Sequence, residues 1–293
     1  MIDLKPANVE NFIASYVVTG RKTAIIETGP TSTVNNLLEG LKELNIDFED
    51  IAYLMVSHIH LDHGGGAGTL LRYLPNAKVV VHPRGIPHLI NPEKLWVQAK
   101  QVLGKIAEIY GEPSPVPESR LLAAEDDMQI DLGNGVEIQI IETLGHASHH
   151  VSYYDRKSGI LFPGDTAGIY VEKLDVTLPT TPPLLFLPKI LESLGKLIKL
   201  APKKLCYTHF GAANNAVGKL EAYLNQLKLW ASIIREGLKN GESLEVISRR
   251  IVERDSAVKK AMKYFKNHPI MNYEMLMRDV QGFVAYFQKY EMT

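Results

Sequence analysis

The sequence predicts an α/β fold class, followed by a region that contains helices alone. Up to about Gly211, short apolar runs typical of strands alternate with helical stretches. Beyond that point apolar residues recur at helical spacing, as at Leu220 and Leu227. We therefore expect a domain at residues 1–211 that carries the functional site, and a helical region at 212–293 that covers it.

The predicted strands are short apolar runs bounded by turn residues. The first is expected to form a hairpin with the second, and the sixth with the seventh. These strands are 11–18, 23–28, 51–56, 78–81, 136–141, 151–154, 160–162 and 204–207. Helices are expected at 31–44, with Thr31 as the N-cap, and at 92–110. In the helical region, Gly241 is the expected stop of one helix, and a further helix includes Leu276 and Phe287.

Composition argues against several classes of function. The 293-residue chain has a formal net charge of −1, which gives no electrostatic reason to expect a nucleic acid or a membrane surface as partner. The N-terminus lacks the basic and apolar segments of a signal peptide, and no apolar run is long enough to span a bilayer, so we expect a cytoplasmic location. The single cysteine, Cys206, excludes an internal disulfide and a cysteine-rich metal site.

A dense group of polar side chains follows the predicted strand 51–56, in the segment His58-Ile-His60-Leu-Asp62-His63. In an extended segment, side chains two residues apart share a face, so His58, His60 and Asp62 are expected to project together, with His63 turned to another side. Gly64-Gly65-Gly66 then allows the backbone to turn closely around the group.

Three further ligand-type residues, His146, Asp165 and His209, each come just after a predicted strand. Loops at the ends of strands are where α/β scaffolds usually present functional groups. An isolated histidine is most often a surface or hydrogen-bonded core residue. Several imidazoles and a carboxylate crowded together, however, repel or desolvate one another unless a cation is present. The sequence therefore predicts a metal site.

With these motifs in this order (H-x-H-x-D-H, then Gly-His, Gly-Asp and Thr-His), the chain resembles the metallo-β-lactamase superfamily over about residues 11–211. The resemblance implies a four-layer αββα sandwich, with the site at one edge of the two sheets and a C-terminal helical extension. It also implies two metal ions, one held by His58, His60 and His146, the other by Asp62, His63 and His209, with Asp165 bridging them. Zinc is favoured because imidazole suits it and it needs no redox partner, with iron and manganese as alternatives.

Two segments depart from the patterns common in the superfamily. Glu27-Thr28-Gly29 stands where many members have Asp-Thr-Gly. Thr143-Leu-Gly-His-Ala-Ser-His-His150 stands where hydroxyacylglutathione hydrolases have Thr-Pro-Gly-His-Thr-x-Gly-His. His150 aligns with the second histidine of that pattern, which would support a metal ligand rather than bind the metal itself.

The expected function is hydrolysis of an ester, a thioester or a lactone in a small-molecule substrate, with water activated by two metal ions. Asp62 is expected to accept or relay a proton, and Tyr170 is a candidate donor to the oxyanion, with a structural role as its alternative. The helical extension resembles that of hydroxyacylglutathione hydrolases and lactonases.

An iron-dependent redox enzyme, of the sulfur dioxygenase or diiron type, is the second hypothesis for the function, and a nucleic-acid phosphodiesterase is the third. The identity of the substrate, the metal used in the cell and a homodimeric state are left open.

Overall fold

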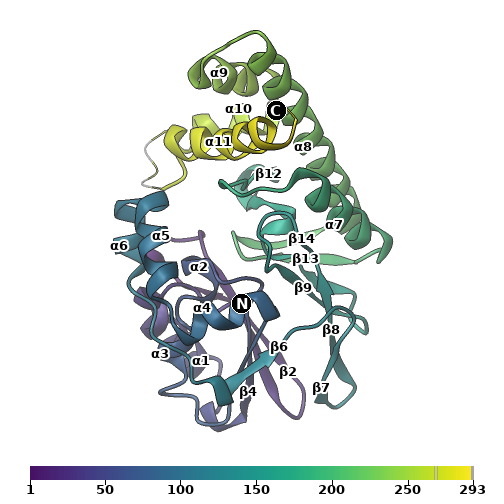
Figure 1. The fold of residues 1–293 in the computed structure, drawn as a ribbon. Coiled ribbons are helices and arrows are strands. Elements are labelled where there is room, and N and C mark those ends of the chain that lie inside the picture. Colours follow the sequence, from purple (N-terminus) through teal and green to yellow (C-terminus); the bar gives the residue numbers. More distant parts are fainter. Residues whose placement is uncertain (267, 269, 292–293) are drawn as a thin grey trace. The chain divides into compact units, whose positions relative to one another are not determined.

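The computed structural model describes residues 1–266, 268 and 270–291, which divide into two compact units (Figure 1). The first unit comprises Met1–Glu142, His149–Gly164 and Lys203–Asn214. The second comprises Thr143–Ser148, Asp165–Pro202 and Asn215–Thr293. Each unit is thus assembled from stretches that are distant in the sequence. The predicted division into domains at 1–211 and 212–293 stays a prediction.

The first sheet of the first unit is mixed and follows the order of the chain. Its strands are β1 (Ile2–Asp3), β2 (Ala14–Thr19), β3 (Thr23–Ile26), β4 (Ile51–Met55), β5 (Lys78–Val81) and β6 (Leu121–Ala123). The first three strands are antiparallel, as predicted for the hairpin, and β3 to β6 are parallel. Because parallel strands end at the same edge of a sheet, the segments that follow β3 and β4 begin side by side.

The second sheet of the first unit has the order β14-β13-β10-β9-β8-β7. Its strands are β7 (Gln129–Gly133), β8 (Val136–Glu142), β9 (Val151–Asp155), β10 (Ile160–Phe162), β13 (Lys204–Tyr207) and β14 (Gly211–Asn214). The expectation that the chain is wholly helical beyond Gly211 is wrong at β14, which pairs antiparallel with β13. Its sequence, Gly-Ala-Ala-Asn, has too little apolar surface to show the alternation by which strands are recognised.

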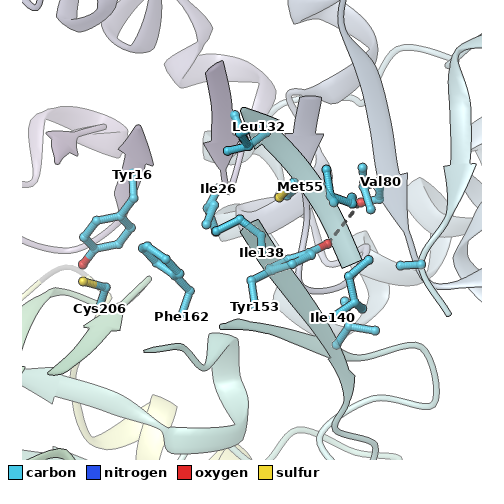
Figure 2. Close-up of a cluster of buried hydrophobic side chains, with 14 of the residues drawn as sticks. Tyr16, Ile26, Met55, Val80, Leu132, Ile138, Ile140, Tyr153, Phe162 and Cys206 are labelled. Atoms are coloured by element: carbon cyan, nitrogen blue, oxygen red, sulfur yellow. Dashed lines mark hydrogen bonds between the residues drawn. The ribbon is translucent and has the colours of Figure 1, made fainter. Parts of the chain in front are cut away.

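Apolar side chains from both sheets form one buried core (Figure 2). Ile26 and Met55 of the first sheet belong to the same cluster as Ile138 and Ile140 of the second, and all four are at most 1 % exposed. Burial of this apolar surface is the main force that holds the two sheets together.

Two tyrosines add polar links across this core, one from each sheet. The Tyr153 hydroxyl of β9 lies 2.8 Å from the Val56 carbonyl oxygen and 3.3 Å from that of Val80. The Tyr16 hydroxyl of β2 lies 2.7 Å from the Tyr207 carbonyl oxygen. Burial raises the pKa of Tyr153 well above its usual value, so its hydroxyl remains a neutral donor. These bonds fix the ends of β4 and β13, where the predicted ligands begin.

The helices of the first unit are α1 (Val34–Glu43), α2 (Leu61–Gly64), α3 (Ala67–Leu70), α4 (Ile86–Ile90), α5 (Glu93–Leu103) and α6 (Lys105–Tyr110). Thr31 is not the cap of α1: it lies in a preceding 3₁₀ turn, and its hydroxyl donates to the Gly65 carbonyl oxygen at 2.8 Å. The single helix predicted at 92–110 is divided in two, because Gly104 has a φ of 56° that no helical residue adopts.

The second unit contains a two-stranded sheet and five α-helices among its described residues. These elements are β11 (Ile169–Val171), β12 (Val176–Leu178), α7 (Leu187–Lys199), α8 (Ala216–Lys239), α9 (Leu244–Arg254), α10 (Ser256–Tyr264) and α11 (Tyr273–Tyr290). Helices α8, α9 and α11 lie side by side (Figure 1). Asp255 caps α10 and also accepts hydrogen bonds from Gln226 and Trp230 of α8. Of the helices in the described ranges, none has the length and apolar character needed to cross a membrane.

The link through Tyr153 gives a test of the sheet packing. Tyr153→Phe should lower the free energy of unfolding by about 1–2 kcal/mol, because the buried Val56 carbonyl loses its donor. Tyr154→Phe, one residue further on and therefore on the other face of β9, should change it by less than about 0.5 kcal/mol. Urea denaturation of the two variants measures the difference. Equal losses in both would show that the hydroxyl of Tyr153 does not link the sheets.

Candidate metal centre

His58 and His60 lie in the short segment between the end of β4 and the start of α2. The His58 Nε2 atom is 2.8 Å from His60 Nδ1. On its other side, His58 Nδ1 is 3.0 Å from the Ser57 hydroxyl oxygen. The Nε2 atom of one histidine and the Nδ1 atom of the other are thus directed at the same point in the first unit.

Asp62 and His63 do not continue the extended segment but begin helix α2. The His60 carbonyl oxygen accepts hydrogen bonds from the backbone of His63 at 3.0 Å and of Gly64 at 2.9 Å, which closes a helical turn. The expectation that Asp62 projects together with His58 and His60 from an extended strand is therefore wrong. Gly66 donates to the Gly29 carbonyl at 2.8 Å, and a Cβ at Gly66 would lie only 3.0 Å from the Thr28 carbonyl oxygen, so any larger residue there would have to displace the turn slightly.

His209, two residues beyond the end of β13, joins Asp62 and His63. Ligand atoms of these three residues all lie within 4.8 Å of one another. The His209 Nε2 atom is 3.5 Å from Asp62 Oδ2, and His209 Nδ1 is 3.1 Å from the Phe12 carbonyl oxygen. The first unit therefore brings together His58 with His60, and Asp62 with His63 and His209.

Glu27, at the end of β3, is a site residue whose role the sequence did not reveal. Its side chain is buried, and its Oε1 atom lies 3.2 Å from His63 Nδ1 and 3.2 Å from the Thr208 hydroxyl. Its other oxygen accepts from the Ser57 backbone at 3.3 Å. Glu27 therefore orients His63 and links the ends of three strands. The only signal in the sequence is that Glu27 stands in place of the aspartate common in the superfamily.

The second unit brings together His146 and Asp165, with His146 Nε2 at 3.4 Å from Asp165 Oδ2. The loop of His146 is held on α7, since the Gly145 carbonyl accepts from the Phe186 backbone at 2.8 Å. A Cβ at Gly145 would lie 2.2 Å from the Ile190 nitrogen, so only glycine fits there. On its other side, His146 Nδ1 is 3.0 Å from the Thr180 carbonyl oxygen.

These backbone partners determine which nitrogen of two rings carries the proton. A carbonyl oxygen only accepts, so Nδ1 of His146 and Nδ1 of His209 must be the donors. In the neutral ring, Nε2 then carries a lone pair, and in both cases it faces a carboxylate oxygen at 3.4–3.5 Å. Two electron-rich atoms that face each other in a buried site repel, and a cation between them removes this repulsion. The donor set of imidazoles and carboxylates, without a thiolate, fits zinc, iron or manganese.

His58 is surrounded by further imidazole rings, including two that are not predicted ligands. The ring of His63 lies 4.1 Å from that of His58, the ring of His150 4.9 Å and the ring of His149 6.2 Å. His150 is fully buried, and a Cβ at Gly164 would lie 2.6 Å from its Nε2, so the glycine that precedes Asp165 makes room for His150. Such crowding disfavours several positive rings at once and favours neutral imidazoles, the form that binds metal.

Tyr170 lies in β11 of the second unit and makes a local contact. Its hydroxyl donates to Asp175 Oδ1 at 2.7 Å, and the Lys219 ammonium lies 4.9 Å from the ring centroid. Burial, and then the bond to Asp175, raise the pKa of Tyr170. Its predicted role as a donor to an oxyanion stays a prediction, and that role would require its hydroxyl to leave Asp175.

Comparisons with known proteins agree with the motifs. A model of the metallo-beta-lactamase superfamily matches residues 9–209. The chain is 30 % identical over 228 residues to a metallo-beta-lactamase fold-containing protein of Sulfurisphaera tokodaii, a match that covers 76 % of this chain and 81 % of that one. An N-acyl homoserine lactonase of Azorhizobium caulinodans is 31 % identical over 123 residues, 41 % of this chain and 43 % of the lactonase. A putative diflavin flavoprotein of Nostoc is 26 % identical over 157 residues, 53 % of this chain and 23 % of the flavoprotein.

Solved structures show the same fold. An archaeal metallo-beta-lactamase superfamily protein from Sulfolobus tokodaii superposes with a TM-score of 0.66 at 30 % identity, over 77 % of this chain and 84 % of that one. A metallo-beta-lactamase family protein from Thermus thermophilus superposes with a TM-score of 0.68 at 19 % identity, over 94 % of this chain and 88 % of that one. By its sequence match and by its fold, the chain belongs to the metallo-beta-lactamase superfamily.

Proposed function

We propose that this protein is a metal-dependent hydrolase in which two metal ions activate water to cleave an ester, a thioester or a lactone. One observation carries the proposal: in two separate places a histidine whose Nδ1 is held by a backbone carbonyl directs its Nε2 atom at a carboxylate oxygen. A divalent cation at each place would satisfy both groups.

The proposed ligands come from both units. His58, His60 and His146 would hold one ion, and Asp62, His63 and His209 the other, with Asp165 between them. The order of these residues in the chain and the match to the metallo-beta-lactamase superfamily over residues 9–209 support this set.

When bound, the two ions would polarise the scissile carbonyl and lower the pKa of a water molecule toward neutrality. The protein itself would orient the ligands and transfer the proton. Glu27, Ser57 and the backbone carbonyls of Phe12 and Thr180 hold the imidazoles in place. Asp62, whose side chain is 19 % exposed against 5 % for Asp165, is the more exposed of these two carboxylates, and it would accept a proton from water and pass it to the leaving group.

Two observations support the proposed substrate class: the similarity to a lactonase and the net charge of the chain. The match to the Azorhizobium lactonase favours a carbonyl substrate such as a lactone or a related ester. The net charge of −1 gives no support to a polyanionic substrate such as a nucleic acid. A panel of lactones, esters, thioesters and phosphodiesters, tested on protein of measured metal content, identifies the class. Cleavage of phosphodiesters alone would contradict this assignment.

A second function, iron-dependent redox chemistry, is favoured by the match to the Nostoc diflavin flavoprotein. The same imidazole and carboxylate ligands suit iron. Metal analysis together with oxygen consumption separates the two functions. Zinc-loaded protein that hydrolyses a substrate without consuming oxygen supports the hydrolase, whereas activity that requires iron and oxygen supports the redox enzyme.

Loss of a proposed ligand gives the first test of the centre. His58→Ala and Asp165→Ala should each remove at least one metal ion per chain and lower hydrolysis at least about 100-fold, since the metals supply several kcal/mol of transition-state stabilisation. The matched control is His88→Ala in α4, outside the proposed ligand set, which should keep full metal content and activity. Elemental analysis and steady-state kinetics measure both quantities. Full activity in either ligand variant would contradict the assignment.

The contact between Glu27 and His63 gives a second test. Glu27→Gln keeps the shape of the side chain but removes the charge that supports His63, so metal affinity should fall about 10–100-fold. Glu142→Gln is the matched control, because Glu142 contacts His82, which is not a proposed ligand, at 3.0 Å. Competition with a chelator measures the affinity of each variant. Equal affinities for the two variants would mean that Glu27 does not support a metal ligand.

A further inference from the structure

A single peptide group in the second unit lies between His146 and the C-terminal helix α11. This is the group between Thr180 and Thr181. Its carbonyl oxygen accepts from His146 Nδ1 at 3.0 Å, and its N–H donates to Asp279 Oδ1 at 2.7 Å. Because a peptide group is planar and rigid, a partner that fixes its N–H also fixes the direction of its carbonyl. Asp279 and His146 are therefore joined through one rigid element.

Helix α11 is held closely against this segment by further contacts. The Thr181 hydroxyl donates to the Asp279 carbonyl oxygen at 3.0 Å, so the two residues are linked twice. One turn further along α11, a Cβ at Gly282 would lie only 1.8 Å from the Thr181 carbonyl oxygen. Only glycine allows the helix to approach the backbone of Thr181 so closely.

Asp279 is a carboxylic acid in an apolar, buried environment, which packing alone does not favour. Its side chain is buried, and it borders a small apolar pocket lined by Leu178, Trp230 and Met275, among others. Burial raises the pKa of Asp279 to about 7, whereas the bond from Thr181 lowers it. An apolar residue would pack in such a position without this cost of desolvation. The carboxyl group therefore has a role other than filling space.

We propose that Asp279 is a positioning residue for His146, which it holds through the Thr180–Thr181 peptide group in the tautomer and orientation that leave Nε2 directed at Asp165. The bond from the Thr181 N–H polarises the peptide group, and this strengthens its carbonyl as the acceptor for His146 Nδ1–H. The inference rests on the proposed function of His146 as a metal ligand. It assigns to α11 a part in metal binding, although the helix supplies no proposed ligand.

Zinc affinity of the purified full chain, measured by competition with a chelator, tests this role. Asp279→Ala should bind zinc about 10-fold more weakly or worse, as for loss of other supporting partners. Asp279→Leu, which fills the same space with an apolar group, should do the same and keeps the test valid if the alanine variant does not fold. Asp279→Asn retains an acceptor for the Thr181 N–H and should stay within about threefold of wild type.

The matched control is Asp255→Ala. Asp255 is also a buried carboxylate of the second unit, and it accepts from Trp230 at 2.9 Å and from Gln226 at 2.8 Å, but none of its hydrogen bonds involves the His146 segment. Its loss should lower thermal stability and leave zinc affinity unchanged. Equal zinc affinities for Asp279→Leu and wild type would overturn the inference while leaving the proposed function intact. Failure of the wild-type protein to bind zinc, iron or manganese would contradict the proposed function instead.

Nitrogen NMR of the histidine rings in metal-free protein tests the inference without any metal. In the wild type, His146 should be in the Nδ1–H tautomer, because Nδ1 donates to the Thr180 carbonyl. In Asp279→Leu, a substantial fraction should change to the Nε2–H tautomer, and in Asp255→Ala the wild-type tautomer should remain. An unchanged tautomer in Asp279→Leu would overturn the inference.

Discussion

The direction in which two imidazole Nε2 atoms point is the constraint on which the proposed metal site depends. The carbonyls of Phe12 and Thr180 accept from Nδ1 of His209 and His146, so that Nε2 of each ring faces a carboxylate oxygen. Neither arrangement is favourable in a buried site without a positive charge between the two groups. The backbone, rather than the side chains alone, therefore specifies where a cation would bind. Membership of the metallo-beta-lactamase superfamily agrees with this reading.

The fold provides these carbonyls and ligands by bringing the ends of strands together. In the first unit, β4 and β13 both end just before proposed ligands, and the tyrosine hydroxyls that cross the core bind carbonyls at those ends. Glu27 adds a third strand end, because it contacts both His63 and Thr208. In the second unit, α7 holds the loop of His146 and α11 holds Thr181. Packing of the apolar core and geometry of the site are thus supported by the same elements.

Much of this arrangement could be predicted from the sequence, and the remainder could not, for physical reasons. Strand ends and ligand-type residues are local patterns, so the segment from His58 to His63 was recognisable as a candidate site. The turn at Asp62 was missed because it depends on hydrogen bonds to the His60 carbonyl, which leave no mark in the residue spacing. Glu27 and Asp279 were missed as supporting groups because each acts on residues far away in the chain, across 36 positions from Glu27 to His63 and 98 from Thr181 to Asp279. Such partners are defined by the tertiary fold.

Anomalous diffraction at the zinc edge, from crystals of the full chain grown with zinc, shows whether the proposed ligands hold metal ions. We expect two anomalous peaks, one bonded to Nε2 of His58 and Nδ1 of His60, the other to Asp62, His63 and His209. Each peak should lie at about 2.0–2.2 Å from its nitrogen and oxygen ligands. An anomalous map with no peak within bonding distance of these atoms would contradict the proposed metal site.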